Sequence, residues 1–377
     1  MHTPGPQPRR CSTSTKLLKP LTYQVNIKVV QGLGRIPSLS SPSLFHSFVM
    51  LPKLSLAFSL VATTLVTLTQ ATPLNAGFAP FLYGNETFQT YYRTFGLHGS
   101  SKAPLIVLHG GPGLSHDYMQ VLSDLSDCRP IILYDQIGNA RSSHLKDKPA
   151  SFWTIDLFVE QLESLISYFQ LKEYGVLGHS WGGILASEFA VTQPKGLKKL
   201  VLSNSPPSSE LWNKAQVELT STLPPLAQQA LANGYGDPNF REAFLGYFHL
   251  HGCDLDPWPR GLNISVEYTF SDPTADVNMW YVVLSVVTSS QTLKPHSECH
   301  RGGPLAAWTI IDRLSEIKVP TLVINGGVNE ITLDWVIQPL LDGIPRAQHY
   351  KFENSTHTPF LEQRSAYMQV VGKFLES

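Results

Sequence analysis

Short apolar runs that alternate with helical patterns constrain the fold of this 377-residue chain more than any other feature. Runs dominated by Val, Ile and Leu are typical of strands that are buried on both faces of a sheet. Their alternation with amphipathic stretches, such as residues 155–169, predicts a mostly parallel, doubly wound α/β sheet. Polar and aromatic segments within residues 72–100 predict an antiparallel hairpin at the edge of that sheet. The predicted strands of the sheet are residues 104–108, 131–134, 174–177, 200–202, 321–324 and 348–352.

This alternation stops after Pro206 and resumes near Ile317. The sequence between these points is richer in aromatic residues, proline and helical patterns, which predicts a mainly helical cap inserted between two strands. Ligands of such sheets bind at the carboxyl ends of the strands. We therefore expect a core in two parts, residues 72–206 and 317–377, with a cap domain of residues 207–316 that closes the ligand pocket.

A serine flanked by glycines follows one of the predicted strands. Residues 178–182 read G-H-S-W-G, directly after the strand at 174–177 and before the helical pattern at 183–190. Small residues allow a sharp strand-to-helix turn that lifts the serine hydroxyl above the sheet, at the amino end of a helix. This context predicts that Ser180 is a nucleophile; the alternative is a structural serine in a glycine-rich turn.

A second glycine-rich segment, H-G-G-P-G at residues 109–113, follows the strand at 104–108. Glycines let the backbone approach a ligand closely. We expect the amide of Gly110 or Gly111, paired with that of Trp181, to form an oxyanion hole. His109 itself is expected to be a packing residue rather than a general base.

The general base is expected late in the chain, because the order nucleophile, acid, histidine is typical of strand–turn–helix serine sites. His357 lies in a loop after the last predicted strand and fits this position. The acid that orients the imidazole should follow the strand at 321–324. The loop there offers two carboxylates, Glu330 and Asp334, and the sequence leaves the choice between them open.

The amino-terminal region predicts secretion. From Met50 the chain has a basic start, an uncharged run at 54–68 and small residues up to Ala71, which together indicate a signal peptide at 50–71. The run is shorter than the ~20 residues of a comfortable membrane span, so we expect no stable span, with a signal anchor as the alternative. Residues 1–49 are then a disordered leader or an extension of the gene model.

The sequence contains three N-glycosylation sequons, which matter only if the chain is secreted. Residues Asn85, Asn263 and Asn354 each stand in an N-x-S/T pattern and become candidate glycosylation sites if the chain enters the secretory pathway.

Composition excludes several other classes of function. The chain has 28 basic and 29 acidic residues, so nucleic acid is not an expected partner. Its four cysteines form no C-x-x-C pair, so a zinc or redox site has no support. The serine chemistry outlined above requires no metal or organic cofactor.

Three motifs taken together resemble the proline iminopeptidase family of α/β-hydrolases, over roughly residues 80–375. They are H-G-G-P-G at 109–113, D-Q-I-G-N-A-R-S at 135–142 and G-H-S-W-G-G at 178–183. Ala140 stands where the family has glycine. The resemblance implies an α/β-hydrolase fold with a helical cap, and an activity like that of prolyl aminopeptidases and L-amino-acid amidases.

The resemblance also implies a role for one acidic residue of the predicted cap. Glu298, in the segment S-E-C-H, aligns with the family's residue that binds the free α-amine of the substrate. A partly buried carboxylate pairs well with an ammonium ion and discriminates against blocked amines. The expected partner is therefore a small molecule or peptide with a free amine.

Two departures from the family pattern bear on activity. Asn329 stands at the position of the family's triad aspartate, with Glu330 beside it, and residues 281–294 resemble an insertion that is either a cap element or an unspliced intron. The leading interpretation is a secreted serine hydrolase that releases an N-terminal residue, proline among the candidates, or cleaves an amino-acid amide. The alternatives are an esterase or amidase of a small metabolite, and a weakly active or inactive protein that has lost the triad acid.

Overall fold

The computed structural model describes residues 75–97, 100–271 and 307–377. All of them belong to one compact unit, Pro73–Ser377. The predicted leader, the signal peptide, the insertion at 281–294 and Glu298 lie outside the described residues.

The core of the unit is an eight-stranded sheet with the order β1-β2-β4-β3-β5-β6-β7-β8. Strands β4, β3, β5, β6, β7 and β8 are parallel, while β1 and β2 form an antiparallel hairpin that pairs with β4 at one edge. The predicted sheet and its edge hairpin are confirmed. The strands are β1 (Ala76–Tyr83), β2 (Glu86–Phe95), β3 (Leu105–Leu108), β4 (Ile131–Tyr134), β5 (Tyr174–His179), β6 (Leu197–Ser203), β7 (Thr321–Gly326) and β8 (Ala347–Phe352).

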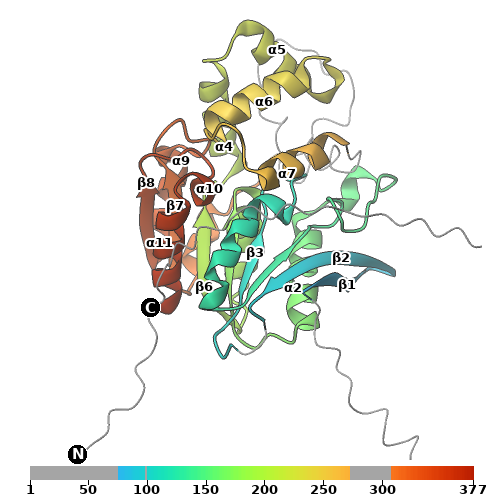
Figure 1. Cartoon of the computed structure of the whole chain (residues 1–377), viewed down its shortest axis with the longest axis vertical. Helices are drawn as coiled ribbons and strands as arrows, with labels where there is room; N and C mark the ends of the chain where they lie inside the picture. The colour runs from blue at the N-terminus through green and yellow to red at the C-terminus, as the bar shows by residue number, and fades with distance from the viewer. Residues whose placement is uncertain (1–74, 98–99, 272–306) are drawn as a thin grey trace, which may run out of the picture. The chain divides into compact units, whose positions relative to one another are not determined.

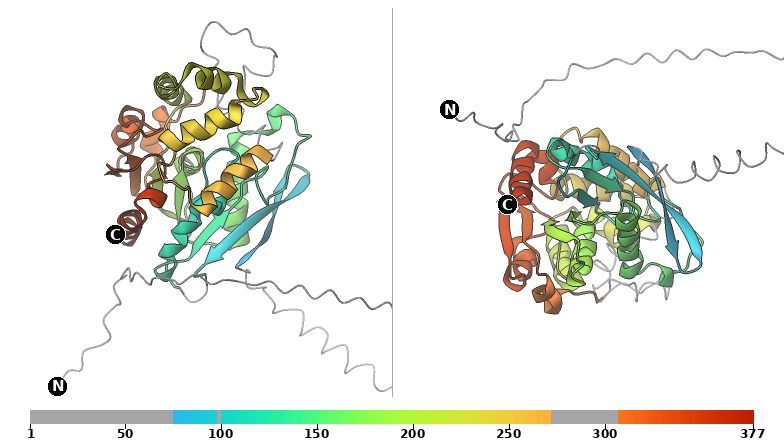
Figure 2. Two further views of the ribbon diagram at one scale, coloured as in Figure 1. Left: turned by 45° about the horizontal axis from the view of Figure 1, so that its top comes forward. Right: turned by 90° about the horizontal axis from the view of Figure 1, so that it is seen from below.

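Helices cover both faces of the sheet, as the two further views show (Figure 2). Alternate residues of β3 explain this: Ile106 and Leu108 pack in the same apolar cluster as α2 and α3, whereas Leu105 and Val107 pack with η1 and α11. Strands β3, β4, β5 and β7 are buried along their whole length, as expected of central strands that are covered on both faces. The core helices are η1 (His116–Asp127), η2 (Ala150–Phe152), α2 (Ile155–Tyr168), α3 (Trp181–Val191), η5 (Ile311–Glu316), α9 (Asp334–Gly343), α10 (Pro359–Glu362) and α11 (Arg364–Glu376).

Between β6 and β7 the chain leaves the sheet and forms a group of helices, which we call the cap helices. Figure 1 shows them beyond the carboxyl ends of the parallel strands. They place aromatic side chains against the same apolar cluster that contains η1 and α11. The cap helices are α4 (Ser209–Thr220), α5 (Pro225–Asn233), α6 (Phe240–His251) and α7 (Arg260–Ser271), with the short η3 (Gly234–Gly236) between α5 and α6.

None of the helices in the described part of the chain has the length and apolar character needed to cross a membrane.

Candidate active site

Ser180 lies at the turn between β5 and α3, with a backbone φ of 53° and ψ of −119°. Such a positive φ is strained for a residue with a side chain. The turn needs its glycines, because a Cβ on Gly178 would lie 2.2 Å from the carbonyl oxygen of Gly182. The amide of Ser180 donates to the carbonyl of Ser203 on β6 over 2.9 Å, which fixes the turn to the neighbouring strand.

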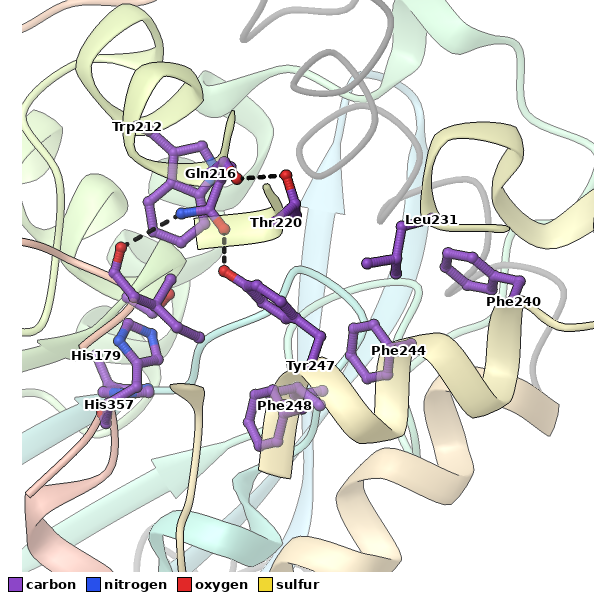
Figure 3. A pocket seen from close by; sticks show the side chains of 14 residues that line it. His179, Trp212, Gln216, Thr220, Leu231, Phe240, Phe244, Tyr247, Phe248 and His357 are labelled. Carbon is purple, nitrogen blue, oxygen red and sulfur yellow. Dashed lines mark hydrogen bonds between the residues drawn. The ribbon is translucent and has the colours of Figure 1, made fainter. Parts of the chain in front are cut away.

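His357 lies in the loop between β8 and α10 and lines the same cavity as Ser180 (Figure 3). Its imidazole is buried, and Nδ1 lies 2.6 Å from Oε1 of Glu330. When a carboxylate accepts a hydrogen bond from Nδ1, the neutral imidazole carries its proton on Nδ1. Nε2 is then unprotonated and can accept a proton. The structure thus brings three of the predicted site residues together.

Glu330 is the carboxylate that reaches His357, and Asp334 is not. The Asp334 side chain is 64% exposed and pairs with Lys351 Nζ at 2.8 Å and Asn325 Nδ2 at 2.7 Å. Asn329, at the family's aspartate position, has a φ of 46°, and its carbonyl oxygen accepts from His251 Nδ1. Of the two carboxylates between which the sequence could not choose, only Glu330 contacts His357.

Three further donors hold the buried carboxylate of Glu330. The amides of Gly326 and Thr332 donate to it over 2.8 Å each, and Asn204 Nδ2 donates to Oε2. These N–H groups favour the ionised form, but burial works against it and raises the pKa of Glu330 to about 8. Burial also lowers the pKa of His357 to about 3, so the ring is neutral in the resting protein.

The predicted oxyanion hole needs one correction. The amide of Gly110 donates to the hydroxyl of Tyr118 over 2.7 Å, so this N–H group is already bonded. Gly111, with a φ of 116°, lines a cavity together with Ser180 and Trp181. Trp181 is the first residue of α3, so its amide has no carbonyl partner within the helix. Gly111 and Trp181 remain the candidate donors.

Two residues that sequence reasoning did not single out link these parts. The Tyr118 hydroxyl lies 2.7 Å from His179 Nδ1, and His179 Nε2 lies 2.9 Å from the carbonyl oxygen of His357. Burial lowers the pKa of His179 well below its usual value, so the ring is neutral and donates to that carbonyl through Nε2. A continuous hydrogen-bond chain therefore runs from Gly110 to the backbone of His357. The position of His179 directly before Ser180 was the one available signal.

His109 has the packing role expected of it. The ring is buried, its Nε2 accepts from the amide of Gln136 over 3.0 Å, and Gln136 Nε2 in turn donates to the carbonyl of His109 over 2.8 Å. These bonds tie the glycine-rich segment to the loop after β4.

Two cavities meet at Ser180. The larger has an empty volume of about 840 Å³ and the smaller about 350 Å³; Gly111, Ser180 and Trp212 line both. The described wall of the larger cavity is completed by Leu114, His179, Gln216, Thr220, Leu231, Phe240, Phe244, Tyr247, Phe248, Ile331 and His357. The described wall of the smaller cavity is completed by Trp181, Ile184, Pro206, Ser208 and Ser209.

The three sequon asparagines do not line these cavities. Asn85, Asn263 and Asn354 are all exposed, in the β1–β2 turn, on α7 and in the loop after β8 respectively. The side-chain Nδ2 of Asn263 donates to the carbonyl of Trp258 over 3.0 Å. Among the described residues, no group of three or more His, Cys, Asp or Glu side chains could hold a metal ion.

The fold and the Ser180 turn together define the class of this protein. The family model of the alpha/beta hydrolase fold matches residues 103–363, so the chain belongs to the α/β-hydrolase fold family.

Closer relatives narrow the class. A proline iminopeptidase of Clostridioides difficile is 30% identical over 313 residues, which are 81% of this chain and 99% of that protein. The solved proline iminopeptidase of Mycobacterium smegmatis is 34% identical with a TM-score of 0.66, and covers 80% of this chain and 97% of its own. The solved structure of VinJ is 32% identical with a TM-score of 0.69, and covers 81% and 99%. The chain belongs to the proline iminopeptidase family of hydrolases, as its motifs predict.

Proposed function

We propose that this protein is a serine hydrolase that releases the N-terminal residue of a small peptide or cleaves an amino-acid amide through an acyl-enzyme. The observation that carries the proposal is the meeting of Ser180, on its strained turn, with the His357–Glu330 pair at one cavity. The name of the C. difficile relative supports an N-terminal proline as one substrate.

In the proposed reaction, Ser180 Oγ attacks the carbonyl carbon of the substrate while His357 Nε2 takes the hydroxyl proton. The tetrahedral intermediate collapses, the C–N bond breaks, and His357 gives the proton to the leaving amine. Water then attacks the acyl-enzyme, with His357 taking its proton and returning it to Ser180 Oγ. Glu330 holds the imidazole through Nδ1 and stabilises the imidazolium that forms twice per cycle.

The amides of Gly111 and Trp181 serve as the oxyanion donors in this proposal. Both residues border the smaller cavity beside Ser180, and the positive end of the α3 dipole adds to the stabilisation of the anion.

Glu298 is proposed to bind the free α-amine of the substrate. It lies outside the described residues, so the support is the resemblance of the segment S-E-C-H to the family pattern. The matched pair of substrates is an aminoacyl arylamide and its N-acetylated form. Glu298→Gln should lower kcat/KM for the free amine at least tenfold and bring the ratio of kcat/KM for the free amine over the acetylated form near one. An unchanged preference for the free amine contradicts this role.

The nucleophile is tested by covalent labelling. A serine-reactive phosphonate should label Ser180 in the folded protein and abolish hydrolysis of a panel of aminoacyl arylamides and acetyl esters. Ser180→Ala should remove both labelling and turnover. Ser187→Ala is the matched control, because Ser187 lies on the same helix with its hydroxyl bonded to the carbonyl of Gly183. Labelling at another residue overturns the proposal, and faster turnover of acetyl esters favours an esterase.

Secretion is also proposed, on the signal-like sequence at 50–71. Expression in a eukaryotic secretory host should give a mature protein that begins at Thr72 and loses mass on treatment with an N-glycosidase. Retention of residues 50–71 in the mature chain contradicts it.

A further inference from the structure

The larger cavity beside Ser180 is lined by a row of aromatic side chains from one cap helix. We propose that it binds the leaving group of the substrate, and that this group is a large, apolar and uncharged amine. The inference rests on the proposed serine mechanism and concerns the side of the scissile bond that the names of the relatives leave unspecified.

The position of His357 assigns the two cavities to the two sides of the scissile bond. A general acid must lie within hydrogen-bond reach of the atom that it protonates, which here is the leaving nitrogen. His357 lines the larger cavity and is not among the described residues that line the smaller one. The leaving amine therefore faces the larger cavity, and the acyl residue takes the smaller cavity beside Ile184 and Pro206.

The wall of the larger cavity is apolar and long. Phe240, Phe244 and Phe248 lie four residues apart on α6, so they share one face of the helix. At 1.5 Å per residue this row extends about 12 Å. Figure 3 shows the row beside the cavity, with Leu231 of α5 near its far end. Ammonia or a small amine could contact only a small part of a row of this length.

The described wall of the cavity carries no charged side chain. None of its described lining residues is Asp, Glu, Lys or Arg. Two hydroxyl groups of its wall donate to Gln216: the Tyr247 hydroxyl to Oε1, and Thr220 Oγ1 to the backbone carbonyl over 2.7 Å. A peptide leaving group with a free carboxylate would bury that charge without a partner, which is strongly unfavourable.

The first experiment varies the leaving group while the acyl residue stays proline. The substrates are prolinamide, proline octylamide and proline 2-naphthylamide, together with Pro-Leu and its uncharged carboxamide. We expect kcat/KM to rise from prolinamide to the larger apolar amides, and to be at least tenfold higher for the Pro-Leu carboxamide than for Pro-Leu. Equal values for the last pair, or a preference for prolinamide, overturn the inference.

The second experiment changes the wall. Phe244→Ala should lower the ratio of kcat/KM for proline octylamide over prolinamide at least tenfold, and Phe244→Leu should lower it less. Leu250→Ala is the control, because Leu250 lies on the same helix and is 40% exposed. If Phe244→Ala instead changes the preference among acyl residues with one leaving group, the cavity belongs to the acyl side and the inference is wrong.

A binding measurement separates this inference from the proposed function. Ser180→Ala protein should bind 2-naphthylamine, followed by its fluorescence, and addition of Phe244→Ala should weaken the binding at least tenfold. Absence of binding while the parent protein hydrolyses prolinamide overturns the inference alone. Failure of the parent protein to hydrolyse any of the five amides, with no labelling of Ser180, overturns the proposed function and the inference with it.

Discussion

At the scale of single residues, the carboxylate that reaches His357 belongs to the residue after the family's aspartate position. The family position holds Asn329, and the next residue, Glu330, reaches His357. Glutamate is one methylene longer than aspartate, and Asn329 adopts a positive φ, so the loop brings the neighbouring carboxylate to the imidazole. The loss of the aspartate therefore does not leave His357 without a carboxylate.

Glu330→Gln should lower kcat/KM by about 10³–10⁴, because an amide at this position can hold the imidazole in the wrong tautomer. Asp334→Asn is the matched control and should stay within about twofold of the parent, since Asp334 pairs with Lys351 at the surface. Steady-state kinetics on an aminoacyl arylamide measures kcat/KM of both variants. An equal loss in both would assign the effect to the loop rather than to the carboxylate.

The dependence of kcat/KM on pH should reflect the ionisation of Glu330. Burial, with the nearby charge of Asp334, raises the pKa of Glu330 to about 8, and burial keeps His357 neutral down to a pKa of about 3. The active form has Glu330 ionised, so kcat/KM should rise with pH until it levels off above about 8. In Glu330→Gln this rise should vanish from the residual activity. A rise centred between pH 6 and 7 that survives the substitution would point to an imidazole instead.

Tyr118 offers a test of the hydrogen-bond chain behind the site. Tyr118→Phe leaves the Gly110 amide and His179 Nδ1 without a partner, which typically costs about 1–3 kcal/mol per buried group. We expect kcat to fall about 10- to 100-fold while KM changes little. Tyr134→Phe is the control, because the buried Tyr134 hydroxyl has no hydrogen-bond partner among the described residues. A larger change in KM than in kcat would speak against a positioning role.

At the scale of elements, α7 is attached to the segment that carries the candidate oxyanion donor. The amide of Ser115 donates to Ser265 Oγ over 2.7 Å, and Thr269 Oγ1 donates to the carbonyl of Gly113 over 3.0 Å. One cap helix therefore fixes the end of the glycine-rich turn through two hydrogen bonds.

Ser265→Ala should destabilise this attachment, because the buried amide of Ser115 loses its acceptor; the expected loss of unfolding free energy is about 1–3 kcal/mol. Denaturant unfolding measures it, and kcat should fall with it. Ser271→Ala on the same helix is the control, since its hydroxyl bonds to the carbonyl of Glu267 within α7. Equal stability of the two variants would contradict the attachment.

The sequence predicts an element when the signals that determine it lie within that element or beside it in the chain. The strand at 131–134 and the helix beginning at residue 155 are found where predicted, since apolar runs and the capping side chain of Thr154 are local signals. The bond from His179 to the carbonyl of His357 and the aromatic row of α6 beside Ser180 could not be predicted. They depend on contacts between segments far apart in the chain, which periodicity does not encode.

At the scale of the whole unit, the site is assembled from both sides of the insertion. Ser180 and the candidate oxyanion donors come from the chain before the cap helices, and Glu330 and His357 come from the chain after them. The hydrogen bond from His179 to the carbonyl of His357 joins these two parts directly behind the nucleophile. Changes in the cap helices that face the larger cavity can therefore alter what is bound while the reacting groups keep their places.

The shared wall of the two cavities at Trp212 has a consequence for chemical probes of this protein in cell extracts, where many serine hydrolases react with the same electrophiles. A reactive phosphorus or carbamate group at Ser180 could carry a compact substituent in the smaller cavity and an extended hydrocarbon along α6 in the larger one. The extended part would have to match the row of three phenylalanines on α6. Selectivity of an inhibitor for this protein should therefore reside in its leaving-group half.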